Sequence, residues 1–308
     1  MTTSSDTSRI STPAPRGILV PLVTPFTADG EHVALDALEG LAHSVLADGA
    51  VGLVALGTTA EAATLDAAEK EAILDVCARV CRERGAALIV GAGTNDTRAS
   101  VHILRAYRDR PEITGFLTPV PYFTRPSETG VVAHFARLAA DSPAPLIVYN
   151  VPYRTSRTIG VETLLRLARI PRVAGVKHSV GAIDQDTIAL LAADPAGFGI
   201  WAGDDLYLSP LLALGATGGI LASAHLATRH FVDLVHAWDA GDAATARKAG
   251  HPLATLSAAL FAEPNPTVIK GVLHEQGRIP SPAVRLPLLP AESASVAAAV
   301  DALARVEK

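Results

Sequence analysis

The residue with the strongest chemical potential is Lys177, which ends the short apolar stretch Val173-Ala174-Gly175-Val176. Pro171 and Gly181 flank this stretch, so it is predicted to be a buried β-strand. Burial disfavours the charged ammonium, and a buried lysine therefore offers a neutral amine near pH 7. Such an amine is the nucleophile that forms a Schiff base with a ketone. The alternative, from this stretch alone, is a lysine that meets solvent or forms a salt bridge at the strand end.

Polar residues also follow other apolar stretches. Gly57, Thr58 and Thr59 offer backbone N–H groups and hydroxyls that suit a carboxylate. Tyr149 beside an amine can carry protons during imine formation, and Arg154 can hold a second carboxylate with its two-pronged guanidinium. Taken singly, the threonines could cap a turn, the tyrosine could pack with a satisfied hydroxyl, and the arginine could form a surface ion pair. Their joint placement at strand ends favours one shared site.

These residues need a scaffold that brings several strand ends together. Apolar stretches and helical patterns alternate along the chain, and the continuous apolar character of the stretches is typical of a parallel sheet covered by helices. The predicted strands are Gly17–Val20, Val51–Leu56, Ala87–Val90, Gly115–Thr118, Leu146–Tyr149, Val173–Lys177, Gly199–Ala202 and Gly218–Leu221. Eight such units predict an α/β fold, a closed (β/α)8 TIM barrel with its chemistry at the strand ends. No Gly-x-Gly-x-x-Gly motif follows the first strand, which argues against a dinucleotide-binding sheet.

Three segments are expected along the chain. Residues 1–15 are rich in Ser, Thr and Pro and lack an apolar core, which is typical of a disordered tail rather than a signal peptide. Residues 16–240 would form the catalytic barrel. Residues 241–308 would form a C-terminal helical extension, with a proline-rich bend at Glu263–Pro266.

Composition excludes several classes of function. The 308 residues are 49% apolar and 19% charged, which is typical of a globular protein with a large core. The formal charge of −5 gives no basic footprint for nucleic acid or for an anionic membrane, and no apolar run approaches the ~18 residues of a membrane span. Cys77 and Cys81 lack a CxxC spacing, which indicates a reducing, cytoplasmic compartment. No paired Cys/His spacing predicts a metal site.

Several motifs together resemble the dihydrodipicolinate synthase/N-acetylneuraminate lyase superfamily. They are Gly57-Thr58-Thr59-x-Glu61, Tyr149-Asn150-x-Pro152-x-Arg154-Thr155, Gly175-x-Lys177, Gly203-Asp204-Asp205 and Glu263-Pro264-Asn265-Pro266. The resemblance runs from about Gly17 to the C-terminus. It implies a TIM barrel with a C-terminal helical extension, usually a homotetramer built as a dimer of dimers. It also implies class I aldolase chemistry on pyruvate or a related 2-oxo acid, with an aldehyde as the second substrate and no metal or organic cofactor.

The resemblance also assigns roles to positions of this chain. Lys177 would form the Schiff base, and Tyr149 would be the central proton carrier. Thr58 and Thr59 would bind the carboxylate of the 2-oxo acid, with Thr59 also taking part in the proton relay.

Three further positions bear on the pocket and on the second substrate. Gly203 and Ile220 would line the pyruvate pocket through their backbones. Arg154 matches the arginine that holds the carboxylate of aspartate semialdehyde in the synthase branch, which the sialate lyase branch lacks. The nearest activity in the family is therefore that of 4-hydroxy-tetrahydrodipicolinate synthase.

Three positions depart from the family pattern. Ala60 replaces a glycine, and if that position requires a positive φ the alanine would cost about 1 kcal/mol. Phe123 replaces the tyrosine that a neighbouring subunit lends to the proton relay, and it has no hydroxyl. His178 replaces an acidic residue and is expected to point away from the site of Lys177, because adjacent strand residues alternate between two faces.

These departures keep other activities open. The main rival is another pyruvate aldolase, or a 2-keto-3-deoxy sugar acid aldolase or dehydratase. Phe123 would slow a synthase, whereas with a different aldehyde it would shape an apolar pocket. A non-catalytic protein that binds a 2-oxo acid as a regulator is the alternative of another class, and Lys177, Tyr149 and Thr59 argue against it.

Overall fold

The computed structural model describes residues 15–307, and eight parallel strands within them close into a barrel. The strands are β1 (Gly17–Pro21), β2 (Gly52–Ala55), β3 (Ala87–Gly91), β4 (Gly115–Pro119), β5 (Leu146–Asn150), β6 (Val173–His178), β7 (Gly199–Ala202) and β8 (Gly218–Ile220). Each strand pairs with its neighbour in sequence, and β1 closes the barrel against β8. The predicted TIM barrel is confirmed. The predicted disordered tail lies outside the described residues, apart from Pro15.

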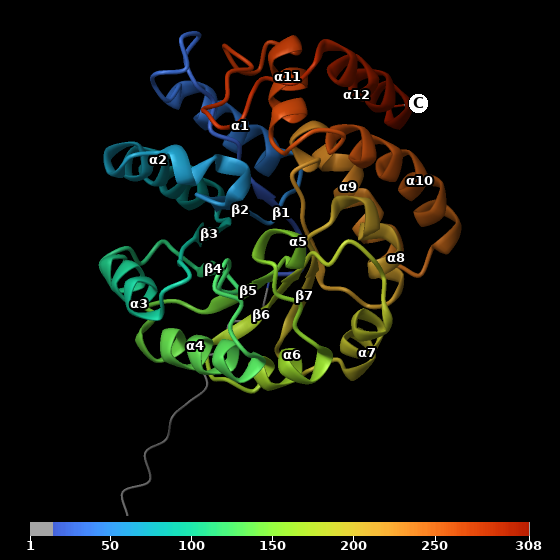
Figure 1. Ribbon diagram of the computed structural model, residues 1–308. Helices are drawn as coiled ribbons and strands as arrows, with labels where there is room; N and C mark the ends of the chain where they lie inside the picture. Colours follow the sequence, from blue (N-terminus) through green and yellow to red (C-terminus); the bar gives the residue numbers. More distant parts are fainter. Residues whose placement is uncertain (1–14, 308) are drawn as a thin grey trace, which may run out of the picture.

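Helices surround the barrel as an outer ring (Figure 1). The ring contains α1 (Leu35–Ala47), α2 (Ala67–Arg84), α3 (Thr97–Ala106), α4 (Glu128–Asp141), α6 (Val161–Ala168), α7 (Gln185–Ala193), α8 (Leu208–Ala213) and α9 (Ala224–Asp239). The single turn of α5 (Pro152–Thr155) lies inside this ring, near the centre of the view. Helix α2 begins with a capping box, in which Asp66 accepts from the Glu69 backbone and Glu69 accepts from the Asp66 backbone. Such a box satisfies backbone N–H groups that the first helical turn leaves unpaired, so it fixes where α2 starts.

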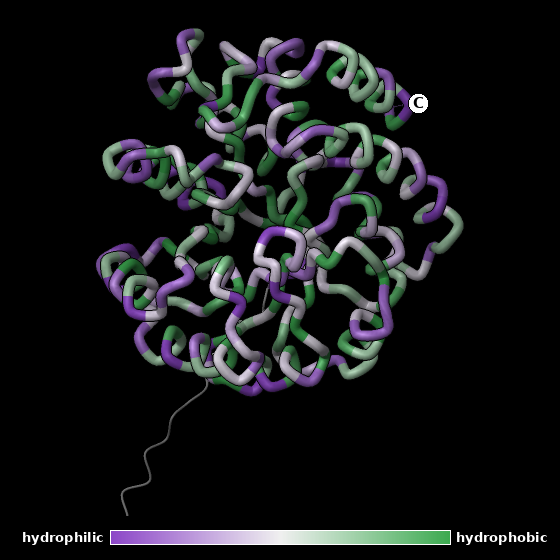
Figure 2. Tube along the Cα trace, in the orientation of Figure 1, coloured by the Kyte–Doolittle hydropathy of each residue, from purple (hydrophilic) through white to green (hydrophobic). Residues whose placement is uncertain are grey.

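Apolar side chains form two layers, one inside the barrel and one between the strands and the helices. Alternate strand residues face the lumen, where Leu19, Val54, Ile89, Leu117, Ile147 and Trp201 pack with Tyr149 and Ile220. The other strand residues pack against the apolar faces of the helices. In Figure 2 the outer helices alternate between green, apolar residues and purple, hydrophilic ones, as expected of helices with one face on the core. No helix in residues 15–307 has the length and apolarity needed to cross a membrane.

Three more helices follow the barrel: α10 (Ala243–Leu260), α11 (Thr267–Glu275) and α12 (Ser293–Val306). They lie together along one side of the ring, coloured orange to red in Figure 1. Helix α10 packs against α9 and α12, and α11 packs against α12. The segment that joins α10 to α11 reaches the end of the barrel where the strands finish, and there it helps to line a cavity.

Candidate active site

Strand register places the predicted nucleophile beside the predicted proton carrier. In the pairing of β5 with β6, Tyr149 lies opposite Lys177, one position before each strand ends. The Lys177 Nζ atom lies 4.5 Å from the centroid of the Tyr149 ring. Both side chains are buried, with Lys177 only 5% exposed. The geometry therefore brings an amine and a phenol together at the carboxyl end of the barrel, where TIM barrels carry their chemistry.

The next residue, His178, faces the opposite way. Its Nε2 lies 3.0 Å from the Thr187 hydroxyl on α7, and its Nδ1 lies 3.4 Å from the Asn150 side chain. Burial lowers the pKa of His178 to about 4, so the imidazole is neutral at pH 7. The prediction that His178 points away from the Lys177 site is confirmed, and we assign it to the interface between β6 and α7.

The electrostatic setting of Lys177 favours a neutral amine. Burial lowers the pKa of Lys177 from 10.5 to about 8, and the nearby carboxylates of Asp205 and Asp204 partly oppose this shift. Burial also raises the pKa of Asp205 to about 6, although the backbone N–H of Ser223 donates to its Oδ2 at 2.6 Å. Burial raises the pKa of Tyr149, and the nearby Arg154 partly offsets this. At neutral pH the site thus holds a phenol and a partly deprotonated lysine.

The two threonines lie in a 3₁₀ turn, η1 (Thr58–Ala60), directly after β2. The Thr59 hydroxyl accepts a hydrogen bond from Asn265 Nδ2 at 2.9 Å. Ala60 has an ordinary backbone conformation within this turn, and the positive φ of 54° belongs to Glu61, the residue that follows. The suggested strain at Ala60 is therefore absent, and the left-handed conformation at the end of the turn is carried by a glutamate.

Gly203 follows β7 and passes very close to the nucleophile. A Cβ atom at this position would lie 2.8 Å from Lys177 Cγ, closer than such atoms normally approach. The Gly203 N–H also donates to the carbonyl of His178 at 2.8 Å, which fixes the chain next to β6. A side chain at Gly203 would therefore displace the lysine that it faces.

Arg154 lies in the short helix α5, which follows β5. Its Nε donates to the Tyr153 hydroxyl at 3.0 Å, and its guanidinium carbon lies 5.1 Å from the Tyr153 ring centroid. Within residues 15–307 no carboxylate lies within salt-bridge distance of Arg154. The guanidinium is thus available to an anionic ligand rather than engaged in the surface ion pair that was the alternative role.

A cavity of about 630 Å³ joins these groups. Its walls include seven of the predicted site residues, namely Thr58, Thr59, Tyr149, Arg154, Lys177, Gly203 and Ile220. Phe123 is the exception, since it lies in the exposed loop between β4 and α4 and is 87% exposed. Its predicted place in a neighbouring subunit's relay stays a prediction.

Sequence reasoning did not assign several residues that the structure brings to the cavity. Asp205, Tyr153 and Phe261 line it, as does Asn265, which contacts Thr59. The motifs around Asp205 and Asn265 were recognisable as family features, but a motif alone does not say which atoms its side chains reach. Phe261 lies at the end of α10, and no sequence pattern links that helix end to the strand ends.

Comparison with known proteins agrees with the geometry. The sequence matches the family described as the dihydrodipicolinate synthetase family over residues 14–305. The 4-hydroxy-tetrahydrodipicolinate synthase of Moorella thermoacetica is 40% identical over 286 residues, which cover 92% of this chain and 96% of that protein. The synthase of Salinibacter ruber is 40% identical over 281 residues, which cover 91% of each chain.

Solved structures give the same result. The chloride-inhibited dihydrodipicolinate synthase from Acinetobacter baumannii, complexed with pyruvate, has a TM-score of 0.89 at 32% identity, covering 96% of this chain and 99% of that one. A monomeric dihydrodipicolinate synthase variant also has a TM-score of 0.89, at 30% identity, covering 95% of this chain and 97% of the variant. Since sequence and structure agree over nearly the whole length, the chain belongs to the dihydrodipicolinate synthetase family.

Proposed function

We propose that the chain is a class I lyase that joins pyruvate to aspartate semialdehyde through a Schiff base on Lys177, as a 4-hydroxy-tetrahydrodipicolinate synthase. The observation that carries this proposal is the buried Lys177, with a pKa of about 8, beside Tyr149 in a cavity lined by Thr58 and Thr59. Desolvation makes the amine nucleophilic, and the hydroxyls and N–H groups of the threonine turn suit a carboxylate.

The first half of the reaction forms the imine. The neutral Lys177 amine attacks the ketone carbon of pyruvate, a C–N bond forms, and the carbonyl oxygen leaves as water. Tyr149, whose ring lies beside the Lys177 amine, would supply and accept the protons of these steps through its hydroxyl. The imine nitrogen then draws electrons from the methyl carbon, which loses a proton and becomes an enamine nucleophile. The imine nitrogen of Lys177 thus serves as the electron sink for this loss of a proton.

The second half joins the aldehyde. The enamine carbon attacks the aldehyde carbon, a C–C bond forms, and the aldehyde oxygen takes a proton. Attack on the imine carbon, by water or by the amine of the added substrate, breaks the C–N bond to Lys177 and frees the lysine. Arg154 stands at the cavity wall without a carboxylate partner among residues 15–307, and its guanidinium suits the carboxylate of aspartate semialdehyde.

The assembly and location are proposals as well. We propose a cytoplasmic homotetramer, in which the barrel of residues 16–240 carries the site and residues 241–308 support it. Tyr122 and Phe123 expose apolar rings on one loop, which suits a contact with a second copy of the chain. A known synthase variant is monomeric, so sedimentation is the measurement that decides the assembly.

Reduction with sodium borohydride tests the chemistry. Pyruvate and borohydride together should inactivate the protein and add the mass of a reduced pyruvate adduct to the peptide that contains Lys177. Lys177→Arg keeps the positive charge but is not a nucleophile at neutral pH, so it should stay unlabelled. Labelling that persists in Lys177→Arg, or no labelling of the wild type, would rule out the proposed chemistry.

A coupled assay with aspartate semialdehyde tests the second substrate. Turnover of pyruvate with this aldehyde, and a lack of turnover with uncharged aldehydes of similar length, is the expected result. Phe123 is the observation that favours a second candidate, a pyruvate aldolase for a different aldehyde, because the family's relay hydroxyl is missing there. Faster turnover with another aldehyde would select that candidate.

A further inference from the structure

The turn that carries Thr58 and Thr59 ends at a glutamate in an unusual conformation. Glu61 has φ 54° and ψ 34°, the left-handed region that non-glycine residues rarely adopt. Its side chain is only 1% exposed. A strained residue with a buried carboxylate persists only where its surroundings hold it, so the partners of Glu61 identify what fixes the turn.

Those partners come from the C-terminal extension. Lys270 on α11 donates to Glu61 Oε1 at 2.8 Å, and its side chain is 0% exposed. The backbone N–H of Arg285 donates to Glu61 Oε2 at 2.9 Å. Both carboxylate oxygens are thus held by residues that lie more than 200 positions further along the chain.

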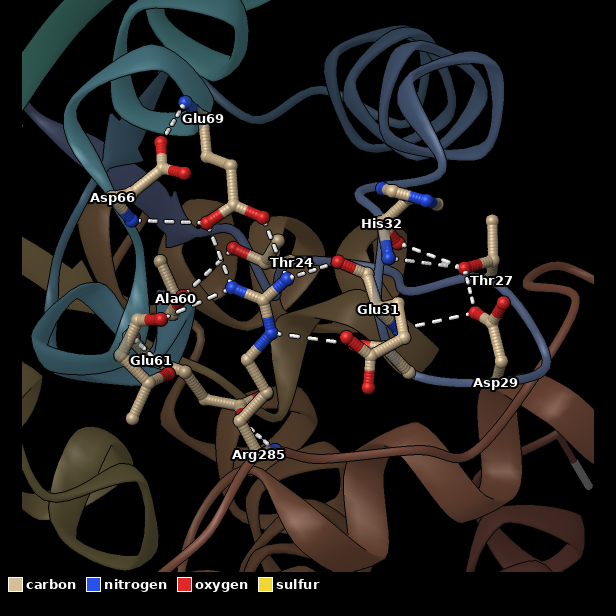
Figure 3. A network of polar contacts seen from close by, with 12 residues as sticks. Thr24, Thr27, Asp29, Glu31, His32, Ala60, Glu61, Asp66, Glu69 and Arg285 are labelled. Carbon is tan, nitrogen blue, oxygen red and sulfur yellow. Dashed lines mark hydrogen bonds and ion pairs between the residues drawn. The ribbon is translucent and has the colours of Figure 1, made fainter.

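Figure 3 shows the hydrogen bonds and ion pairs between Arg285 and the segments around Glu31 and Glu69. Its guanidinium donates to both carboxylate oxygens of Glu69, at 2.7 and 2.6 Å, and to the carbonyls of Thr64 and Glu31. Thr24 supports the turn from the other side, because its hydroxyl donates to the Ala60 carbonyl at 2.7 Å. The turn is therefore fixed by bonds to its backbone and to its last side chain.

A second link from the same extension reaches the site itself. Asn265 Nδ2 donates to the Thr59 hydroxyl, and both residues line the cavity. An amide N–H₂ group is a donor only, so the Thr59 oxygen must accept this bond. The hydrogen of the Thr59 hydroxyl is therefore left for a different acceptor, and the carboxylate of a 2-oxo acid in the cavity suits that role.

We propose that Lys270 and Asn265 are positioning residues for the reaction, which hold the threonine turn in the geometry that binds the 2-oxo acid. Lys270 acts through Glu61, and Asn265 acts through the Thr59 hydroxyl. Neither touches the reacting atoms, and this inference rests on the proposed function. Burial lowers the pKa of Lys270 to about 8, as it does for Lys177, but Lys270 is bonded to Glu61 and does not line the cavity. Lys270 is thus an anchor and not a second nucleophile.

The ordinary alternative is that these bonds only stabilise the fold. The two roles differ in what they change. A lower stability reduces the fraction of folded enzyme and so lowers kcat, whereas the folded enzyme keeps its affinity for pyruvate. A displaced threonine turn weakens the binding of pyruvate by the folded enzyme, because its hydroxyl and N–H groups no longer meet the carboxylate at hydrogen-bond distance.

The test measures the pyruvate concentration that gives half-maximal borohydride trapping on Lys177. We expect Asn265→Ala and Lys270→Met to raise this concentration about tenfold, which is the effect of losing one hydrogen bond to the carboxylate. The matched control is Arg278→Met. Arg278 also joins the extension to the helical ring, by donating to the His225 carbonyl on α9 at 2.7 Å and to the Ser44 hydroxyl on α1 at 3.3 Å, and neither partner belongs to the threonine turn. Arg278→Met should lower the thermal midpoint and leave the half-saturating pyruvate concentration unchanged.

A paired variant separates position from charge. Glu61→Gln combined with Lys270→Gln keeps a hydrogen bond between the two side chains without buried charge, and it should restore most of the pyruvate affinity. If Lys270→Met does not fold, this paired variant still tests whether the bond between positions 61 and 270 positions the threonine turn. Wild-type half-saturation in Asn265→Ala and in the folded variants of Lys270 would overturn this inference alone. Absence of trapping in the wild type would overturn the proposed function, and the inference with it.

Discussion

Replacing Asp205 with asparagine should make Lys177 more reactive at neutral pH. The Asp205 carboxylate stabilises the ammonium form of Lys177 and so opposes the effect of burial on its pKa. The asparagine side chain would keep a carbonyl oxygen to accept from the Ser223 backbone, so the variant removes the charge and leaves the loop supported. The pKa of Lys177 should therefore fall below its present value of about 8.

The structure sets the size of this effect. With a pKa of about 8, roughly a tenth of Lys177 is neutral at pH 7, against about 4 in 10,000 for an unperturbed lysine. Burial thus increases the amount of nucleophile about 200-fold. Because a tenth is already neutral, Asp205→Asn can increase the rate of imine formation at pH 7 by about tenfold at most.

The assay is the initial rate of borohydride trapping at saturating pyruvate, measured from pH 5 to pH 10. The wild-type rate should rise with pH and level off above an apparent pKa of about 8, and in Asp205→Asn the midpoint should lie lower. Below pH 6 the two proteins should converge, since Asp205 has a pKa of about 6 and loses its charge there. A wild-type rate that still rises steeply at pH 10, with no change in Asp205→Asn, would refute this account of Lys177.

Three further predictions concern single groups. Tyr149→Phe should lower kcat by about 10²- to 10⁴-fold in steady-state kinetics, because the variant loses the proton-carrying hydroxyl while its ring still packs. A smaller loss would show that another group carries the proton. Arg154→Lys should raise KM for aspartate semialdehyde and leave borohydride trapping of pyruvate unchanged, because lysine cannot make a bidentate contact with the aldehyde's carboxylate. An equal loss for both substrates would contradict this prediction. Phe123→Tyr should increase the turnover of pyruvate with aspartate semialdehyde, because it restores the family's relay hydroxyl, and no change or a loss would indicate that Phe123 shapes the pocket for another aldehyde. Wild-type kcat of about 10 s⁻¹ or more would show that the missing hydroxyl does not matter.

The barrel and the nucleophile were predictable because both depend on local patterns. A continuous apolar stretch that ends in a lysine can be recognised within five residues of sequence. The alternation of side chains between the two faces of a strand correctly predicts that Lys177 and His178 point in opposite directions. The pairing of Tyr149 with Lys177 also follows once consecutive strands are known to be neighbours.

The remaining features depend on contacts between distant parts of the chain. Nothing around Glu61 indicates a left-handed backbone, because its partners Lys270 and Arg285 stand in a separate segment. The bond from Asn265 to Thr59 likewise requires the C-terminal extension to be docked in three dimensions. Phe123 lies on an exposed loop away from the cavity, so its predicted place in a neighbouring subunit's relay stays a prediction.

The bond between Thr59 and Asn265 joins residues 206 positions apart, and this has a consequence for how the protein matures. A growing chain leaves the ribosome from its N-terminus, so both the threonine turn and Lys177 are made well before Asn265 and Lys270. A barrel whose eight strands have already closed would still hold an unfinished carboxylate subsite. Newly made enzyme should therefore gain its full affinity for pyruvate only when residues 241–308 have been synthesised and docked.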